Sequence, residues 1–240
     1  MNQHTIQRSY LAQFALKRHV RVVDKDSLEF EDLKPNDTGF LIDFQSVENE
    51  EADRQLETNA ISYLHSLKKK NNDISDSARG ALDAWIALHL SRNPREIGEL
   101  TAAGISYDKA KHRLFNHSLT TVREFDEIWR YEINAQDEPL IVSDQPIMFL
   151  ASDAIVFPFS PRVLFILCNG DPRININLSG RMWGEVVNEM SFFAAHSKLF
   201  CRANHCPDLA AVKARSNTIK LQIKRDFISC LLYTSPSPRD

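Results

Sequence analysis

The feature that most constrains the fold is a change in hydrophobic period close to Trp129. Before this residue, apolar side chains recur at helical spacing, and after it they form short β-branched or aromatic runs bounded by Pro, Asp, Asn and Gly. Helices that precede strands in this way, without alternating with them, are typical of α+β proteins. The sequence therefore predicts an α+β fold, with a helix-rich N-terminal half packed on a mainly antiparallel sheet from the C-terminal half.

Five segments have the pattern of helices. Residues 46–70 begin with acidic side chains and end with three lysines, which suits the helix dipole, and Leu56, Ala60, Leu64 and Leu67 share one face. A second helix, in the range 75–94, is predicted to end before Pro94. Three further ranges show similar periodicity: 118–129 (with Leu119, Val122, Phe125 and Trp129), 179–197 (with Met182, Val186, Met190 and Phe193) and 207–215.

The predicted strands are short and separated by turn residues. Two lie in 19–33, and the others lie in 140–149, 154–167, 173–178, 198–202 and 219–224. The block Ser143-Asp144-Gln145-Pro146 interrupts the apolar run 140–149. Because Asp and Ser bond the local backbone and Pro fixes its direction, this block predicts a hairpin-like turn.

Bulk properties exclude several classes of protein. The 240 residues are 43% hydrophobic and 25% charged, which are ordinary values for a globular protein. A net charge of −3 gives no basic footprint, so nucleic acid is not favoured as a partner. The chain contains no apolar run of membrane-spanning length and no signal peptide, which predicts a cytoplasmic protein without a membrane partner. No internal repeat or linker divides the chain, so one domain is expected.

The last eleven residues form a separate case. The string CLLYTSPSPRD, residues 230–240, matches one reading frame of a translated sequencing adapter. We therefore expect a single α+β domain over residues 1–229, cut close to Ser229 with a native C-terminal segment missing, and a non-native tail over 230–240.

The cysteines do not predict a metal site or a disulfide framework. With four Cys in the chain, a disulfide scaffold is not expected. His196, Cys201, His205 and Cys206 supply the ligand types of zinc, but they lack its knuckle spacing, so we predict no metal. The simpler interpretation packs Cys201 as a small core residue in a strand, with Cys206 at the start of the next helix.

Two polar residues fall on an apolar helical stripe. Leu82, Trp85, His89 and Arg92 share one side of the helix 75–94. We favour a structural interpretation, in which His89 is hydrogen-bonded in the core and Arg92 extends its charged end to water from the last turn. The alternative is a functional site that uses both residues.

The order of several short motifs resembles the bacterial family known as domain of unknown function 4238. LIVSDQPI followed by IVFPFSP is similar to the family's S-D-N-P and P-L-S-P blocks. His4, Tyr10, Leu11 and Phe14 correspond to its opening H-Y-V-P and Y-L-x-x-F segments. HLSRNPRE resembles its R-x-P-x-R helix end, which maps onto Arg92, Pro94 and, one position before the second Arg of the pattern, Arg95. Asn188 resembles an Asn of its late helix. The resemblance extends from His4 to about Arg202.

This chain departs from the family pattern at three places, one of which is a short stretch between Arg95 and Phe115. Thr5-Ile6-Gln7 replaces Y-V-P, and Gln145 stands where the family has Asn. The resemblance implies no particular reaction. It does select candidate residues, which are His4, Arg92 and Asp144 for catalysis and Ser143, Gln145, Asn188 and Arg95 for ligand binding.

Two functions of different classes follow from these residues. In one, they pin the opening segment onto the sheet, and the protein is a ligand-binding or regulatory module. In the other, His4, Arg92, Asp144 and Asn188 converge in one cleft, and the protein is a hydrolase of a phosphate ester or another anionic compound, with or without a divalent metal. The chain has no Gly-rich phosphate loop, G-x-S-x-G elbow or H-E-x-x-H motif. The module is therefore slightly favoured, its partner class being a small anionic ligand, and the sequence leaves the cofactor unknown.

Overall fold

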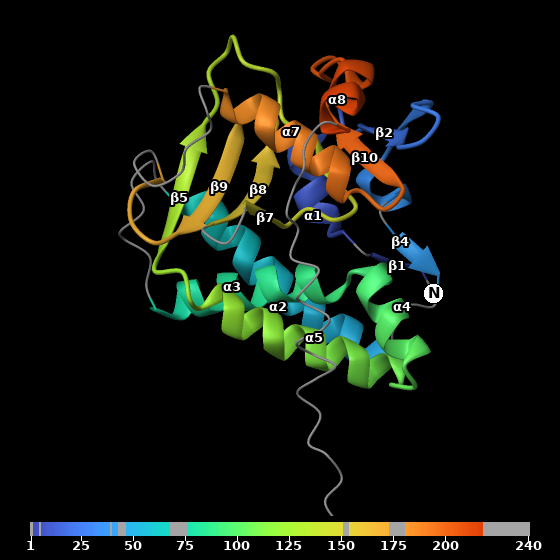
Figure 1. The fold of residues 1–240 in the computed structure, drawn as a ribbon, viewed down its shortest axis with the longest axis vertical. Coiled ribbons are helices and arrows are strands. Elements are labelled where there is room, and N and C mark those ends of the chain that lie inside the picture. Colours follow the sequence, from blue (N-terminus) through green and yellow to red (C-terminus); the bar gives the residue numbers. More distant parts are fainter. Residues whose placement is uncertain are drawn as a thin grey trace, which may run out of the picture.

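A computed structural model of the protein describes residues 2–4, 6–38, 40–42, 47–67, 76–150, 154–172 and 181–217. For residues 2–4, 40–42, 47–52 and 94 the backbone alone is described. Figure 1 shows helices α2 to α5 on one side of the molecule and most of the strands, with α7 and α8, on the other. The α+β prediction is confirmed.

The N-terminal segment forms small elements that line the core. Strand β1 (Asn2–His4) pairs with β4 (Phe40–Ile42), and β2 (Val20–Asp24) pairs with β3 (Phe30–Leu33), both antiparallel. The two strands expected in 19–33 are thus confirmed. Between these pairs lie α1 (Arg8–Leu11) and the 3-10 turns Ala12–Phe14 and Pro35–Asp37.

The helical layer consists of α2 (Val47–Ser66), α3 (Asp76–Ser91), α4 (Pro94–Ala102) and α5 (Tyr107–Val122). The predicted faces of α2 and α3 are confirmed, since Ala60, Leu64, Leu82 and Trp85 are buried. Helix α4 and the first part of α5 were not predicted. The side chain of Asn93 accepts a hydrogen bond from the N–H of Arg95, so this residue and Pro94 start α4.

The predicted helix over 118–129 is wrong in its second half. Helix α5 ends at Val122, and Glu127–Glu132 is strand β5. The intervening chain is held by Arg79 of α3, which donates hydrogen bonds to the carbonyl oxygens of Phe125 and Asp126. The N–H of Asp126 donates to the side chain of Asn169. These tertiary contacts reverse the chain where the local spacing continues a helical pattern.

One four-stranded sheet has both faces buried. Its order is β5-β9-β8-β7, with β7 at Met148–Leu150, β8 at Ala154–Ser160 and β9 at Val163–Cys168. Alternate residues face two different hydrophobic clusters. Phe157 and Phe165 belong to the main core with Tyr10, Trp85 and the helical layer, whereas neighbouring residues such as Val156 and Ile166 pack against α7 (Trp183–Ala194). Burial of both faces explains why this stretch is almost continuously apolar.

The second four-stranded sheet brings distant segments together. Its order is β3-β2-β10-β6, with β6 at Val142–Ser143 and β10 at Lys198–Cys201. Strands β6 and β7 therefore belong to different sheets. The hairpin-like turn predicted for 143–146 is wrong, because this block is a crossing between the two sheets.

The late helices confirm two predicted segments. Helix α7 lies within the predicted range 179–197, and α8 (Leu209–Ser216) lies within 207–215 except for its last residue. On α7 the predicted stripe is only partly buried, since Met182 and Phe193 are exposed. The strands expected at 173–178 and 219–224, the tail 230–240 and the C-terminal boundary at 229 lie outside the described residues.

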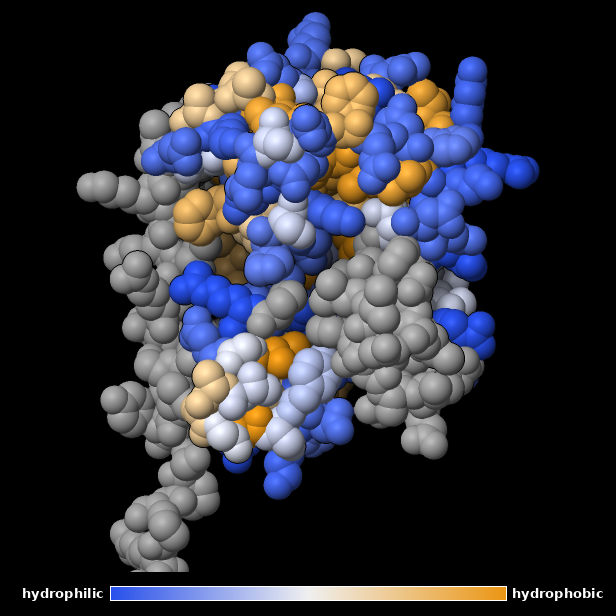
Figure 2. All heavy atoms as spheres, turned by 90° about the vertical axis from the view of Figure 1, so that its right-hand side faces the viewer, coloured by the Kyte–Doolittle hydropathy of each residue, from blue (hydrophilic) through white to orange (hydrophobic). Residues whose placement is uncertain are grey.

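The described surface is mostly polar. Figure 2 shows a face on which hydrophilic side chains surround small hydrophobic groups. Phe30, Met182 and Phe193 are the large hydrophobic residues exposed in the part of the chain that the structure describes. No helix among those residues is long and apolar enough to cross a membrane.

Candidate functional site

Arg92 lies in a buried ion-pair network between α2, α3 and α5. Its Nη1 donates to Glu57 Oε1 at 2.6 Å and its Nη2 to Asp53 Oδ2 at 3.0 Å. Lys111 Nζ donates to the same Asp53 oxygen at 3.0 Å. The Arg92 side chain is 4% exposed, so the expectation that it extends to water is wrong. Two cations face two carboxylates, and the network neutralises itself without an external anion.

Burial and pairing act against each other in this network. Burial raises the pKa of the Glu57 carboxyl above its ordinary value, although the charge of Arg92 opposes the shift. Burial alone would lower the pKa of Arg92, but the attraction of Glu57 and Asp53 outweighs it, and the pKa is raised. Burial lowers the pKa of Lys111. Arg92 is therefore a permanent charge that keeps two helices joined to α3.

His89 is buried one turn before Arg92. Its ring packs against those of Trp85 and Tyr10, with centroids 4.6 and 6.1 Å away. Neither ring nitrogen has a hydrogen-bond partner among the described residues, so the expected core hydrogen bond is absent there. Burial, helped by the nearby positive charge of Arg92, lowers the pKa of His89 well below its ordinary value. The imidazole is consequently neutral at physiological pH.

Asp144 caps the turn between α7 and β10. Its Oδ1 accepts from the N–H of His196 at 2.7 Å, and its Oδ2 accepts from the N–H groups of Ser197 and Lys198 at 2.8 and 3.0 Å. The Ser197 hydroxyl donates to Oδ2 as well. The hydrolase alternative places Asp144 in one cleft with His4 and Arg92. The described partners of the Asp144 carboxylate are instead three backbone N–H groups and one hydroxyl of the α7–β10 turn.

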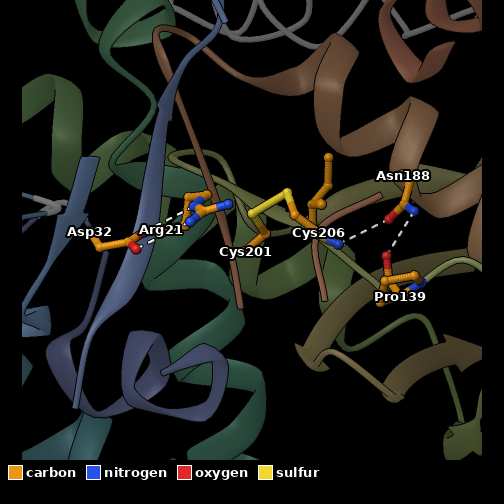
Figure 3. The surroundings of a disulfide bond; sticks show 7 residues. Arg21, Asp32, Pro139, Asn188, Cys201 and Cys206 are labelled. Atoms are coloured by element: carbon orange, nitrogen blue, oxygen red, sulfur yellow. Dashed lines mark hydrogen bonds and ion pairs between the residues drawn. A yellow bond between two sulfur atoms is a disulfide. The ribbon is translucent and has the colours of Figure 1, made fainter. Parts of the chain in front are cut away.

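Asn188 ties α7 to the chain that leads into β6. Its Oδ1 accepts from the N–H of Ile141 at 2.9 Å, and its Nδ2 donates to the carbonyl oxygen of Pro139 at 3.0 Å (Figure 3). The side chain is completely buried. Asn188 thus supplies hydrogen-bond partners for the backbone of Pro139 and Ile141, so its role is structural.

The other candidates occupy varied positions. Ser143 is buried, and its hydroxyl bonds the backbone of Gln145 in both directions, donating to the carbonyl oxygen and accepting from the N–H. Arg95 is 77% exposed and pairs with Glu99 one turn later on α4. The backbone of His4 pairs with Phe40 in the β1–β4 ribbon, and its side chain lies outside the described residues.

The structure does not join the described candidate side chains into one set. No hydrogen bond or ion pair described for Arg92, Asp144 or Asn188 connects any two of them. Sequence reasoning missed Asp53 and Glu57 as partners of Arg92. Their signal was available, because carboxylates four residues apart share a face of α2.

Two of the four residues considered as zinc ligands form a disulfide. Cys201 and Cys206 are bonded to each other with Cα atoms 5.4 Å apart (Figure 3). The prediction of Cys201 as a buried strand residue is confirmed. The sequence analysis did not predict this single disulfide, and Cys206 precedes α8 by three residues instead of starting it. Across the described parts of the chain no group of three or more His, Cys, Asp or Glu residues is placed to hold a metal ion.

Comparisons with protein-family models, with curated proteins and with solved structures found no match. The class that can be stated is therefore an α+β protein with two antiparallel four-stranded sheets among its described residues.

Proposed function

We propose that the protein is a cytoplasmic bacterial module of the domain of unknown function 4238 type that binds a small anionic ligand or has a regulatory role. The observation that carries this proposal is the contrast between Arg95 and the other described candidates. Arg92, Asp144 and Asn188 are each held by separate contacts within the fold. Arg95 is a cation open to solvent.

The ion pair of Arg95 leaves it available to a ligand. Its Nε lies 3.1 Å from Glu99 Oε1, but both side chains are well exposed. Exposed pairs of this type contribute roughly 0 to 1 kcal/mol, so an anion can replace Glu99 at little cost. A guanidinium also matches carboxylate or phosphate groups in a two-pronged geometry. The proposed ligand contact is therefore Arg95, at the start of α4.

A thermal-shift screen with small phosphate and carboxylate compounds tests the binding proposal. A ligand that binds only the folded protein raises its melting temperature. We expect the shift to disappear in Arg95→Gln and to persist in Arg113→Gln, a control that removes another exposed arginine, on α5. Equal shifts in the two variants would contradict the assignment of Arg95.

The hydrolase is the competing function, and it has a separate test. We expect no turnover of p-nitrophenyl phosphate above background, with or without Mg²⁺, Mn²⁺ or Zn²⁺. Turnover that is lost in Arg95→Gln and retained in Arg113→Gln would replace the binding module by an anion hydrolase. That outcome would still place the anion at Arg95.

A further inference from the structure

The disulfide lies at a tight turn between β10 and α8. Arg202 and His205 form an isolated antiparallel bridge, and the N–H of His205 donates to the carbonyl oxygen of Arg202 at 2.8 Å. Cys201 and Cys206 flank the bridged residues Arg202 and His205, so the turn places the two cysteines opposite each other. The bond therefore closes a loop that the backbone has already closed.

The two cysteines differ in their exposure to solvent. Cys201 is 1% exposed at the end of β10, whereas Cys206 is half-buried and follows two exposed residues, Asn204 and His205. Thiol–disulfide exchange begins when a thiolate reaches one sulfur of the bond, so access selects the sulfur that is attacked. We therefore infer that an external thiolate attacks Cys206 Sγ.

A cation lies beside the buried sulfur. Arg21 of β2 is directly opposite Cys201 in the β2–β10 register, so both side chains leave the same face of the sheet. Arg21 Nε and Nη2 donate to Asp32, at 2.9 and 3.2 Å, and these two bonds do not use Nη1. Figure 3 shows the guanidinium between Asp32 and the disulfide. A positive charge at this place stabilises a thiolate that forms on Cys201.

The bond also connects β10 to a helix that is held by apolar and by polar contacts. Helix α8 contributes Val212 to the cluster that contains Cys201, and Leu209 packs against that cluster. Hydrogen bonds from Arg215 also tie α8 to α7 and to the chain before β6, Nε to Glu189 at 2.9 Å and Nη2 to Glu138 at 2.8 Å. Arg215 is about one-third exposed. The disulfide is therefore a covalent restraint on the segment that leads into α8.

We propose that Cys201–Cys206 is a thiol–disulfide exchange site, which a dithiol reduces in the folded protein and which thereby controls the mobility of the β10–α8 connection. This proposal stands apart from anion binding at Arg95, and either can fail without the other.

The exchange balances in two steps. A thiolate of the dithiol attacks Cys206 Sγ, forming a mixed disulfide and breaking the Cys201–Cys206 bond, and the bonding electron pair goes to Cys201 Sγ beside Arg21. The second thiolate of the reductant then attacks the first sulfur of the same reductant, which is bonded to Cys206 Sγ in the mixed disulfide. Cys206 leaves as a thiolate. The two protein thiolates take up the two protons that the dithiol has lost. The protein disulfide is reduced by two electrons, and the dithiol is oxidised to a cyclic disulfide.

The first experiment treats the folded full-length protein with dithiothreitol and follows Cys201 and Cys206 by alkylation and peptide mapping. We expect complete reduction at a dithiol concentration that leaves the circular dichroism spectrum unchanged. Hydrogen exchange should then become faster in residues 207–217 and stay unchanged in β8 and β9. A disulfide that is reduced only when the protein unfolds, or an unchanged exchange rate in 207–217, would overturn the proposal.

A second experiment compares the accessibility of the two cysteine sulfurs to a thiol-exchange reagent. Cys201→Ser leaves Cys206, and we expect it to form a mixed disulfide with oxidised glutathione faster than Cys206→Ser, which leaves Cys201. Cys168 is an internal reference, because burial raises its pKa to about 11 and keeps it a thiol at neutral pH. Equal or reversed rates at the two positions would contradict attack at Cys206.

A third experiment tests the cation. We expect Arg21→Gln to slow reduction by dithiothreitol several-fold and Arg21→Lys to restore most of the rate, since lysine keeps the charge. Arg130→Gln is the matched control, because Arg130 is also 22% exposed and also pairs with a strand carboxylate, Glu132, but lies in the other sheet. Equal rates in Arg21→Gln and Arg130→Gln would exclude a role for Arg21.

Discussion

At the scale of single residues, two polar side chains, Asp144 and His89, are expected to affect the stability of the fold. Asp144 accepts three backbone N–H groups and one hydroxyl, and so fixes the position of β10 relative to β6. His89 is the opposite case, a buried imidazole whose two nitrogens have no hydrogen-bond partner in the described structure. Removing the charge of Asp144 should therefore destabilise the protein, and so should adding a charge to His89 by protonation.

We expect Asp144→Asn to destabilise the protein by about 2 to 3 kcal/mol. Asn offers a single acceptor oxygen, and its amide group faces donors that have no other acceptor. Urea unfolding measures the loss, and Asp126→Asn, at an exposed position, is the control, with an expected change within roughly 0.5 kcal/mol. Equal stability of the two variants would show that the turn does not depend on the carboxylate.

His89 should make the protein less stable in acid. Because its folded pKa is lowered, the unfolded chain binds the proton more readily, and stability is lost as pH falls below the ordinary histidine value of about 6.5. The contribution to the slope approaches about 1.4 kcal/mol per pH unit. Urea unfolding from pH 7.5 to 5 should show a flatter profile for His89→Leu, whereas His112→Gln, at an exposed histidine, should retain the original slope. Parallel profiles for all three proteins would contradict this assignment.

At the scale of elements, the change from α5 to β5 depends on a residue of α3. Arg79 pairs with Asp83 one turn later at 2.7 Å and also donates to the backbone of Phe125 and Asp126. Asp83 is itself buried. A single guanidinium therefore satisfies a buried carboxylate and fixes the place where the chain leaves the helical layer for the sheet.

We expect Arg79→Met to cost about 3 to 5 kcal/mol, because it leaves the Asp83 carboxylate buried without its cation. The double variant Arg79→Met with Asp83→Leu should recover part of this loss, since the unpaired charge is gone. Denaturant unfolding of the wild type, both single variants and the double variant measures the coupling. Additive losses would show that Arg79 and Asp83 act independently.

At the scale of the whole molecule, the network around Arg92 connects α2, α3 and α5, three helices that are separate in sequence. The same helices cover one face of the sheet β5-β9-β8-β7, and α7 covers the other. The helical layer is thus held by apolar contacts to the sheet and by ion pairs within itself.

We expect Arg92→Met to destabilise the protein by about 3 to 5 kcal/mol at pH 8 and by less at pH 5. Without the guanidinium, burial still raises the folded pKa of Glu57, so its stabilising protonation is present at low pH and lost as pH rises. Urea unfolding at the two pH values measures the difference. The control Arg92→Met with Glu57→Gln should lose much of this pH dependence, and an unchanged dependence would contradict the role of Glu57.

The α+β class, α2, α3, α7, α8 and the strand segments 19–33 and 154–167 were readable from the sequence because each carries its own period and end signals. Anion binding at Arg95 is a proposal. The sequence also selected Arg92 and His89 as unusual, since polar groups on an apolar stripe are visible without coordinates.

Tertiary structure alone decided what these residues contact. The end of α5 depends on Arg79, about forty residues away, and the separation of β6 from β7 depends on pairing with β10. Asp144, Asn188 and the pair Cys201–Cys206 acquire their partners in the same way. Local periodicity records which side of an element is buried, but the partner is set by how elements pack, and that information is absent from any short window of sequence.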